Sequence, residues 1–133
     1  MINYQLADLV SRLHVASSKF LNSVLVLYNI LNLRFLLLLN VEGVIEGFRV
    51  VGHSILVFLK FSYLNLYMVF KNVKILSSPG NRVFWTLPKL SKKYFYSNFS
   101  GFFIISSSKG LLTSADALLK YRISGEVLFK IFI

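Results

Sequence analysis

The residues best suited to contact a polar partner form one run, residues 106–110, directly after the apolar segment 101–105. In order, its members are Ser106, Ser107, Ser108, Lys109 and Gly110. A serine hydroxyl both donates and accepts hydrogen bonds, and Lys109 adds a positive charge. Such groups complement the 2′-hydroxyls, base edges and phosphate oxygens of RNA. Gly110 permits a sharp turn. The run is therefore a candidate RNA contact, and a polar loop between two core elements is the alternative.

The charge of the chain points to a polyanionic partner. The 133 residues carry a formal net charge of +10, and a chain this basic usually meets nucleic acid or an anionic membrane surface. Residues 1–69 hold five basic and three acidic side chains, whereas residues 70–133 hold ten basic and two acidic ones. We therefore expect the polyanion to meet mainly the second half of the chain.

The residues that an active site needs are missing. The chain has no cysteine, which excludes disulfides, thiolate zinc sites and thiol catalysis. Neither His14 nor His53 has an Asp, Glu or His neighbour at metal-ligand spacing, and five acids leave little general-base capacity. Paired carboxylates, an activated nucleophile and a phosphate-binding glycine loop do not occur. We expect no enzyme activity, no metal, no cofactor and no small-molecule substrate.

Helical and extended patterns alternate in the first half of the chain. Apolar residues repeat at helical spacing over residues 5–19. Residues 24–27 have the pattern of a buried strand, and Asn29 can cap a helix over residues 30–40. An alternative is a small basic membrane protein with a span near residues 24–41. Arg34 argues against that span, because a central arginine costs about 2.5–3.5 kcal/mol on insertion.

Further strands follow in β-prone runs. Residues 48–51 and 55–61 flank a turn and predict a hairpin. Residues 66–76 form a third run, and the Ser-Ser-Pro-Gly turn at residues 77–80 leads into a strand over residues 82–86. The hairpin belongs to the first half of the chain, and the later runs predict a β-rich second half.

The last third of the chain holds one irregular stretch, one short helix and a closing strand. Residues 87–100 are the least regular stretch, and their interleaved lysines and aromatic residues fit either stacking on RNA or a solvated loop anchored by a few rings. Residues 113–116 resemble a capping box that opens a short helix to about Tyr121. The closing strand spans residues 126–133 and starts at Glu126, whose carboxylate accepts hydrogen bonds either from protein donors or from RNA.

Together these patterns predict an α+β protein of two small α/β domains. The first domain, residues 1–68, has the order helix, strand, helix, strand, strand. The second domain, residues 69–133, is β-rich with one short helix and carries the RNA contact.

Six short motifs resemble one family, the eighth protein of the small ribosomal subunit. They occur in the family's order and spacing and run nearly from end to end of the chain. The motifs are ADLVSRL at 7–13, EGVI at 42–45, LKF at 59–61, SPGNRVF at 78–84, SSSKG at 106–110 and SGEVL at 124–128. The resemblance agrees with the predicted two-domain α+β fold.

The resemblance implies a structural protein that binds the central domain of small-subunit rRNA and supports its assembly for translation. It implies neighbouring small-subunit proteins as further partners and no membrane span. The RNA-binding residues carried over to this chain are Ser106, Ser107, Ser108, Lys109, Gly110, Phe84, Arg82, Glu126, Arg12 and Lys60. Among the serines we expect Ser106 to matter least, because it follows the apolar Ile105 and is satisfied within the fold.

Two departures from the family pattern indicate a divergent organellar member. His14 stands where the family usually has Asn, and residues 27–30 replace a Pro-Ser-Ser-Lys motif and lose its lysine. The chain is 56% hydrophobic and is rich in Leu, Phe, Ile, Tyr, Asn and Lys, which A/T-rich codons specify. Such a bias is frequent in organellar genomes. We expect a mitochondrial ribosomal protein rather than a plastid one.

Overall fold

The chain folds into two compact units. The computed structural model describes residues 2–62, 67–78, 80–96 and 101–132. The first unit ends at Asn72, and the second comprises Val73–Phe132. A boundary between independently folding domains at residues 68 and 69 stays a prediction.

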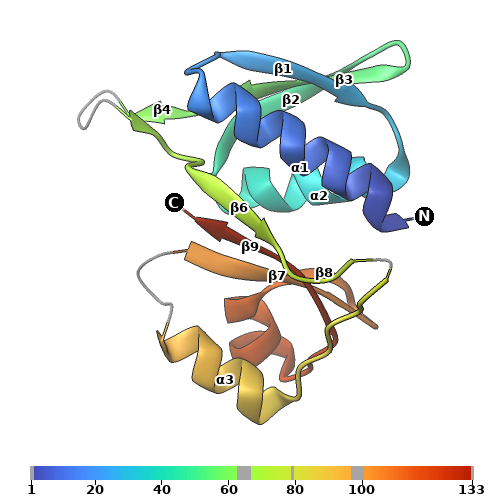
Figure 1. Cartoon of the computed structure of the whole chain (residues 1–133), viewed down its shortest axis with the longest axis vertical. Helices are drawn as coiled ribbons and strands as arrows, with labels where there is room; N and C mark the ends of the chain where they lie inside the picture. Colours follow the sequence, from blue (N-terminus) through green and yellow to red (C-terminus); the bar gives the residue numbers. More distant parts are fainter. Residues whose placement is uncertain (1, 63–66, 79, 97–100, 133) are drawn as a thin grey trace. The chain divides into compact units, whose positions relative to one another are not determined.

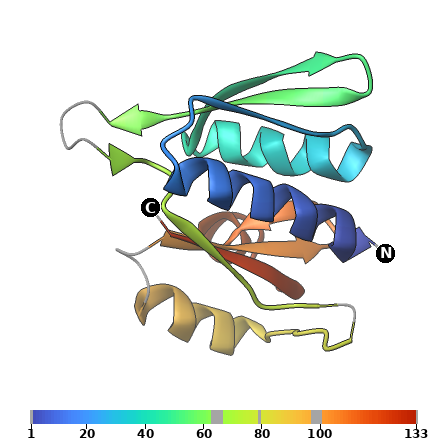
Figure 2. The ribbon, with the colours of Figure 1, turned by 45° about the horizontal axis from the view of Figure 1, so that its top comes forward.

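The first unit has the predicted order of elements. They are α1 (Ile2–Ser18), β1 (Ser23–Leu27), α2 (Ile30–Val41), β2 (Ile45–Val51) and β3 (Ser54–Leu59). Two short strands, β4 (Phe61–Ser62) and β5 (Tyr67–Met68), form a separate antiparallel pair. Strands β1, β3 and β2 make an antiparallel sheet with β3 in the centre, and both helices lie on one side of it (Figure 2).

The core of the first unit follows from the apolar periodicity of α1. Leu6, Leu9 and Leu13 recur on one helix face, and each is 1% exposed or less. The sheet contributes Ile55 and Val57, which alternate with half-buried neighbours along β3. Each fully buried leucine or isoleucine contributes about 1.5–3 kcal/mol, so these side chains fix α1 against the sheet.

The most hydrophobic stretch is divided between a strand and a short helix. Asn29 caps α2, since its Oδ1 accepts from the Asn32 backbone N–H at 2.8 Å. Asn32 in turn donates its Nδ2 hydrogen to the Leu27 carbonyl at 2.9 Å, which ties the helix to the end of β1. Helix α2 has 12 residues. No helix in the described part of the chain has the length and apolar character that a membrane span requires.

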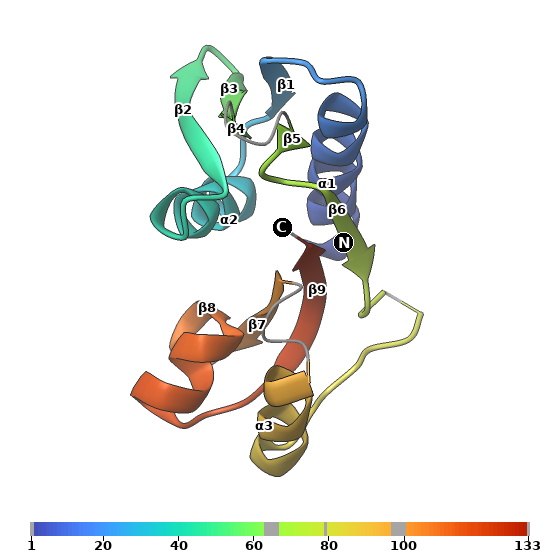
Figure 3. The same cartoon turned by 90° about the vertical axis from the view of Figure 1, so that its left-hand side faces the viewer.

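The second unit is a four-stranded antiparallel sheet with helices. Its elements are β6 (Asn72–Ile75), α3 (Leu87–Tyr96), β7 (Gly101–Ser107), β8 (Gly110–Thr113), the π-helix η1 (Asp116–Tyr121) and β9 (Glu126–Phe132). The strand order is β6-β9-β7-β8, and both helices lie on one face of the sheet (Figures 1 and 3). The α+β class is confirmed.

Two local predictions in the second unit differ from the structure. Residues 87–96 of the stretch expected to be irregular form α3, and residues 97–100 lie outside the described part. Leu90 is buried and Leu87 and Tyr94, at i−3 and i+4 from it, are half-buried, so α3 has the spacing of an amphipathic helix and the prediction of an irregular stretch is wrong. Residues 82–86 form no regular strand, because only Phe84 is bridged, to Glu126 of β9.

The helix-covered face of the sheet holds the core of the second unit. Its buried members are Leu90, Phe103, Ile105, Leu112, Ala117 and Val127. Trp85 packs edge-on against Phe103, with ring centroids 5.0 Å apart. The Thr113 hydroxyl accepts from the Asp116 N–H at 3.3 Å, as the predicted capping arrangement requires.

Gly125 lets the start of β9 lie close to the end of β7. A Cβ on Gly125 would lie 2.2 Å from the Ser106 carbonyl oxygen, a backbone atom that cannot turn aside. We expect Gly125→Ala to destabilise the protein by about 1–3 kcal/mol or more, measured by urea denaturation. Gly80→Ala is the matched control, because no atom lies within 4 Å of its added Cβ. Equal stability of the two variants would contradict this packing.

Candidate functional site

Three of the predicted site residues form one row across the sheet. Phe84 is bridged to Glu126, and Glu126 is paired with Ser106 of β7. Residues directly opposite in antiparallel strands point to the same face with Cβ atoms about 4.5–5.5 Å apart. Ile105 lies in the core under α3 and η1, so Ser106, its neighbour along β7, points to the other face. The row therefore lies on the face of the sheet opposite α3 and η1.

The serine run forms the tip of the β7–β8 hairpin. Ser107 pairs with Gly110, and Ser108 and Lys109 make the turn between them. Ser108, Lys109 and Gly110 are exposed. Gly110 has φ of +100°, a conformation that a side chain would strain. The tip thus presents a hydroxyl, an ammonium group and open backbone to a partner.

The hydroxyls of the three serines have different roles. Ser107 Oγ donates to the Gly110 carbonyl at 3.1 Å and accepts from the Lys109 N–H at 3.2 Å. The hydroxyls of Ser106 and Ser108 have no hydrogen bond to the described residues. The expectation that Ser106 is the serine satisfied within the fold is wrong, because the hairpin turn uses Ser107 instead. Ser108 is the exposed serine whose hydroxyl is available to a partner.

Glu126 is held by donors from outside its own strand. Its Oε1 accepts from the Ser77 hydroxyl at 2.5 Å and from Arg82 Nη1 at 3.0 Å. The side chain of Glu126 is 18% exposed and that of Arg82 is 38% exposed. Arg82 therefore neutralises the carboxylate locally and adds a partly exposed guanidinium group next to the row.

Phe84 is fixed through its backbone and leaves its ring free. The Val127 N–H donates to the Val83 carbonyl at 2.9 Å, and the Trp85 N–H donates to the Gly125 carbonyl at 3.3 Å. The Ser124 hydroxyl also donates to the Trp85 carbonyl. These bonds hold residues 83–85 along the start of β9. The Phe84 side chain is 68% exposed, so its ring can pack against a base or a sugar.

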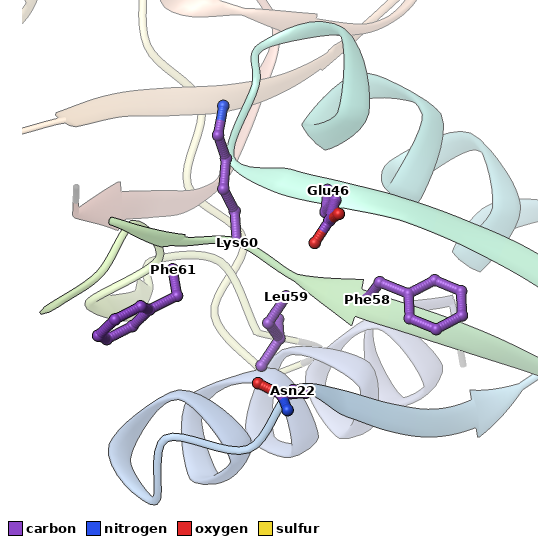
Figure 4. A pocket seen from close by; sticks show the side chains of 6 residues that line it. All are labelled: Asn22, Glu46, Phe58, Leu59, Lys60 and Phe61. Carbon is purple, nitrogen blue, oxygen red and sulfur yellow. The ribbon is translucent and has the colours of Figure 1, made fainter. Parts of the chain in front are cut away.

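Arg12 and Lys60 belong to the first unit and are not part of the row. Arg12 Nε lies 3.2 Å from Asp8 Oδ2, and its Nη1 donates to the Leu25 carbonyl at 3.1 Å. Lys60 is exposed and lines a cavity of about 410 Å³ with Glu46 and Phe58 among its neighbours. Figure 4 shows Lys60 extending from the opposite side of the strand to Leu59. Both are cations at the surface of the first unit.

Ser77 belongs to the candidate site and was not expected from the sequence. It is 1% exposed, and besides donating to Glu126 it accepts from the Val83 N–H at 3.2 Å. It therefore positions both the carboxylate and the segment that carries Phe84. In the sequence it is one of two serines before a Pro-Gly turn, and Glu126 is 49 residues away. No local signal marks it.

The side chains of the candidate site are suited to hydrogen bonding, stacking and contact with anions. The exposed groups are hydroxyls, backbone, two cations and a ring. The one carboxylate is paired with Arg82 and Ser77 and so is not a free base. No cluster of His, Asp or Glu suited to a metal ion occurs among the described residues.

Comparison with known proteins shows an end-to-end relationship to one family. The family described as ribosomal protein S8 matches residues 4–132. The small ribosomal subunit protein uS8m of Acanthamoeba castellanii is 37% identical over 90 residues, which cover 67% of this chain and 68% of the relative. The protein uS8 of the Wolbachia of Brugia malayi is 32% identical over 129 residues, covering 96% and 95%. Its counterpart in aster yellows witches'-broom phytoplasma is 36% identical over 125 residues, covering 92% of each.

The Ser77 hydroxyl should contribute more to the free energy of unfolding than the hydroxyl of the adjacent Ser78. We expect Ser77→Ala to lower the free energy of unfolding by about 1–3 kcal/mol, because Glu126 and the Val83 N–H each lose a buried partner. Ser78→Ala, the adjacent serine, should change it by no more than about 0.5 kcal/mol. Chemical denaturation of both variants checks this. A harmless Ser77→Ala would mean that Arg82 alone positions the carboxylate.

Proposed function

This chain belongs to the ribosomal protein S8 family, and on that premise we propose that it binds the central domain of small-subunit rRNA and supports the assembly of that domain for translation. As a member of this family it is a structural protein of the small ribosomal subunit. The observation that carries the finer proposal is the row of Phe84, Glu126 and Ser106 beside the exposed hairpin tip.

The row and the tip offer the contacts that folded RNA needs. Phe84 supplies a ring for packing against a base or sugar, and Ser108 supplies a donor and an acceptor for 2′-hydroxyls and base edges. Ser106 adds a second hydroxyl on the same face. Glu126 is already held in place in the free protein, so ordering its side chain on RNA binding costs little conformational entropy.

The cationic side chains supply the part of the affinity for RNA that does not depend on the RNA sequence. Lys109 stands at the exposed tip, and Arg82 lies beside the row, where both can meet phosphate oxygens. The open backbone at Gly110 allows a phosphate or sugar to approach closely. Arg12 and Lys60 are proposed as further backbone contacts, made by the first unit.

The proposed location is the mitochondrial ribosome. A relative from Acanthamoeba castellanii carries the name uS8m, in which the suffix denotes the mitochondrial protein. The abundance of residues encoded by A/T-rich codons supports an organellar origin. Neighbouring small-subunit proteins are the expected protein partners, and no substrate turnover is expected.

The exposed hydroxyl of Ser108 gives the sharpest test of the proposed contact. We expect Ser108→Ala to weaken binding to a fragment of the central domain by roughly tenfold, because its RNA partner loses a hydrogen bond in a partly dry interface. The melting temperature should stay unchanged, since the hydroxyl has no bond to the described residues. Filter binding and thermal denaturation of the same samples measure both.

Two comparisons make this test specific. Ser107→Ala should lower both affinity and stability, because its hydroxyl closes the turn. Ser91→Ala, on α3, should leave affinity unchanged. The proposed contact would be refuted if Ser108→Ala bound the central-domain fragment as tightly as the unaltered protein does. It would also be refuted if the unaltered protein bound a length-matched fragment of another rRNA domain equally tightly.

Lys109 should contribute through a phosphate contact. We expect Lys109→Ala to reduce the slope of log affinity against log salt by about 0.9, the value for one phosphate contact in a duplex. Lys120→Ala, which removes an exposed lysine on η1, should leave the slope unchanged. Titrations at four salt concentrations measure the slope. An unaltered slope for Lys109→Ala would mean that this side chain points away from the RNA backbone.

A further inference from the structure

A second concave surface of the second unit combines aromatic rings with lysines. It is a groove of about 350 Å³, which falls in the size range of small-ligand sites. Its aromatic lining consists of Trp85, Phe103, Phe132 and Tyr96. Phe103 is 5% exposed and Tyr96 is 82% exposed, so buried rings form the floor and Tyr96 offers an open ring at the rim.

Lysines surround these rings. Lys130 Nζ lies 5.4 Å from the centroid of Phe103 and 4.8 Å from that of Phe132, and Lys89 Nζ lies 5.8 Å from the centroid of Trp85. These distances are within the range of cation–π attraction, which holds the ammonium groups close to the floor. Lys74, Lys93 and Leu76 also line the groove, and none of the described residues that line it is Asp or Glu.

Helix α3 aligns part of this lining. Lys93 and Tyr96 both line the groove and stand at positions i and i+3, so they lie on one face of the helix. Leu90 is buried in the core and fixes the rotation of α3. The helix therefore holds one cation and one exposed ring along one edge of the groove.

We propose that this groove binds an unpaired nucleotide of RNA, with its base stacked on Tyr96 and its flanking phosphates near Lys74 and Lys93. A ring with an open face stacks on any base, and lysines beside it track the backbone of a single strand. The absence of acids from the lining favours an anion. This inference rests on the proposed rRNA-binding function and adds a second contact, specific for single-stranded RNA.

The groove is separate from the serine tip. Phe132 pairs with Gly101, whereas Glu126 pairs with Ser106, so about 17 Å of strand lies between the two pairs. Phe103 lies on the helix-covered face of the sheet with Leu90, and Ser106 points to the other face. One RNA element at the tip cannot fill the groove by itself. The groove takes a further segment of the RNA.

Trp85 gives a direct readout, because it is the one tryptophan of the chain and lines the groove. We expect single-stranded hexa-adenylate to quench its fluorescence saturably in the full-length protein at low salt. Tyr96→Ala should weaken this binding at least about fivefold, the lower end for loss of one stacked base. Phe95→Ala is the matched control: this neighbouring ring is 71% exposed but does not line the groove, so binding should stay unchanged.

The outcomes separate this site from the serine tip. Ser108→Ala should leave the quenching by hexa-adenylate unchanged, even where it weakens the central-domain complex. If the proposed RNA contact at the serine tip is wrong, the quenching measurement is therefore unaffected. Absence of quenching, equal loss in Phe95→Ala and Tyr96→Ala, or equal quenching by a hexamer duplex would overturn the proposal. Stronger quenching by a hexaglutamate peptide than by RNA would also overturn it and assign the groove to an acidic protein segment.

Discussion

The second unit depends on the pairing of β9 with three other segments. β9 joins β7 on one side. On the other side it joins β6 and the bridged residue Phe84. Gly125 lets the start of β9 pass the Ser106 carbonyl at a distance that no side chain would permit. Because the hairpin tip and the segment of Phe84 are attached to the same strand, their relative position is set by backbone hydrogen bonds rather than by flexible side chains.

A partly buried carboxylate links this framework to the site. Removing Glu126 from water is unfavourable unless donors replace its hydration. Ser77 and Arg82 supply them. The exposed ion pair by itself is worth little, so the buried hydroxyl is the stronger constraint. The same hydroxyl accepts from the Val83 N–H, and one serine therefore couples the charge of Glu126 to the placement of Phe84.

The two faces of the sheet serve different purposes. The face opposite α3 and η1 buries Ile104 and Phe129 and carries the polar row at its end, beside the serine tip. The helix-covered face holds the core, and its edge leaves the aromatic and lysine side chains of the groove exposed between α3 and the strands. In this groove Lys130 lies over the rings of Phe103 and Phe132, and cation–π attraction keeps them together.

The sequence by itself determined the features that depend on neighbours along the chain. The helix of Leu6, Leu9 and Leu13, the Asn29 cap and the serine turn all rest on contacts within a few residues, and each could be predicted. Only the tertiary structure decided that Ser77 meets Glu126 and that Phe84 stands beside it. Those outcomes depend on pairings 40 or more residues apart. Long-range packing, and not local propensity, supplies the free energy that selects them.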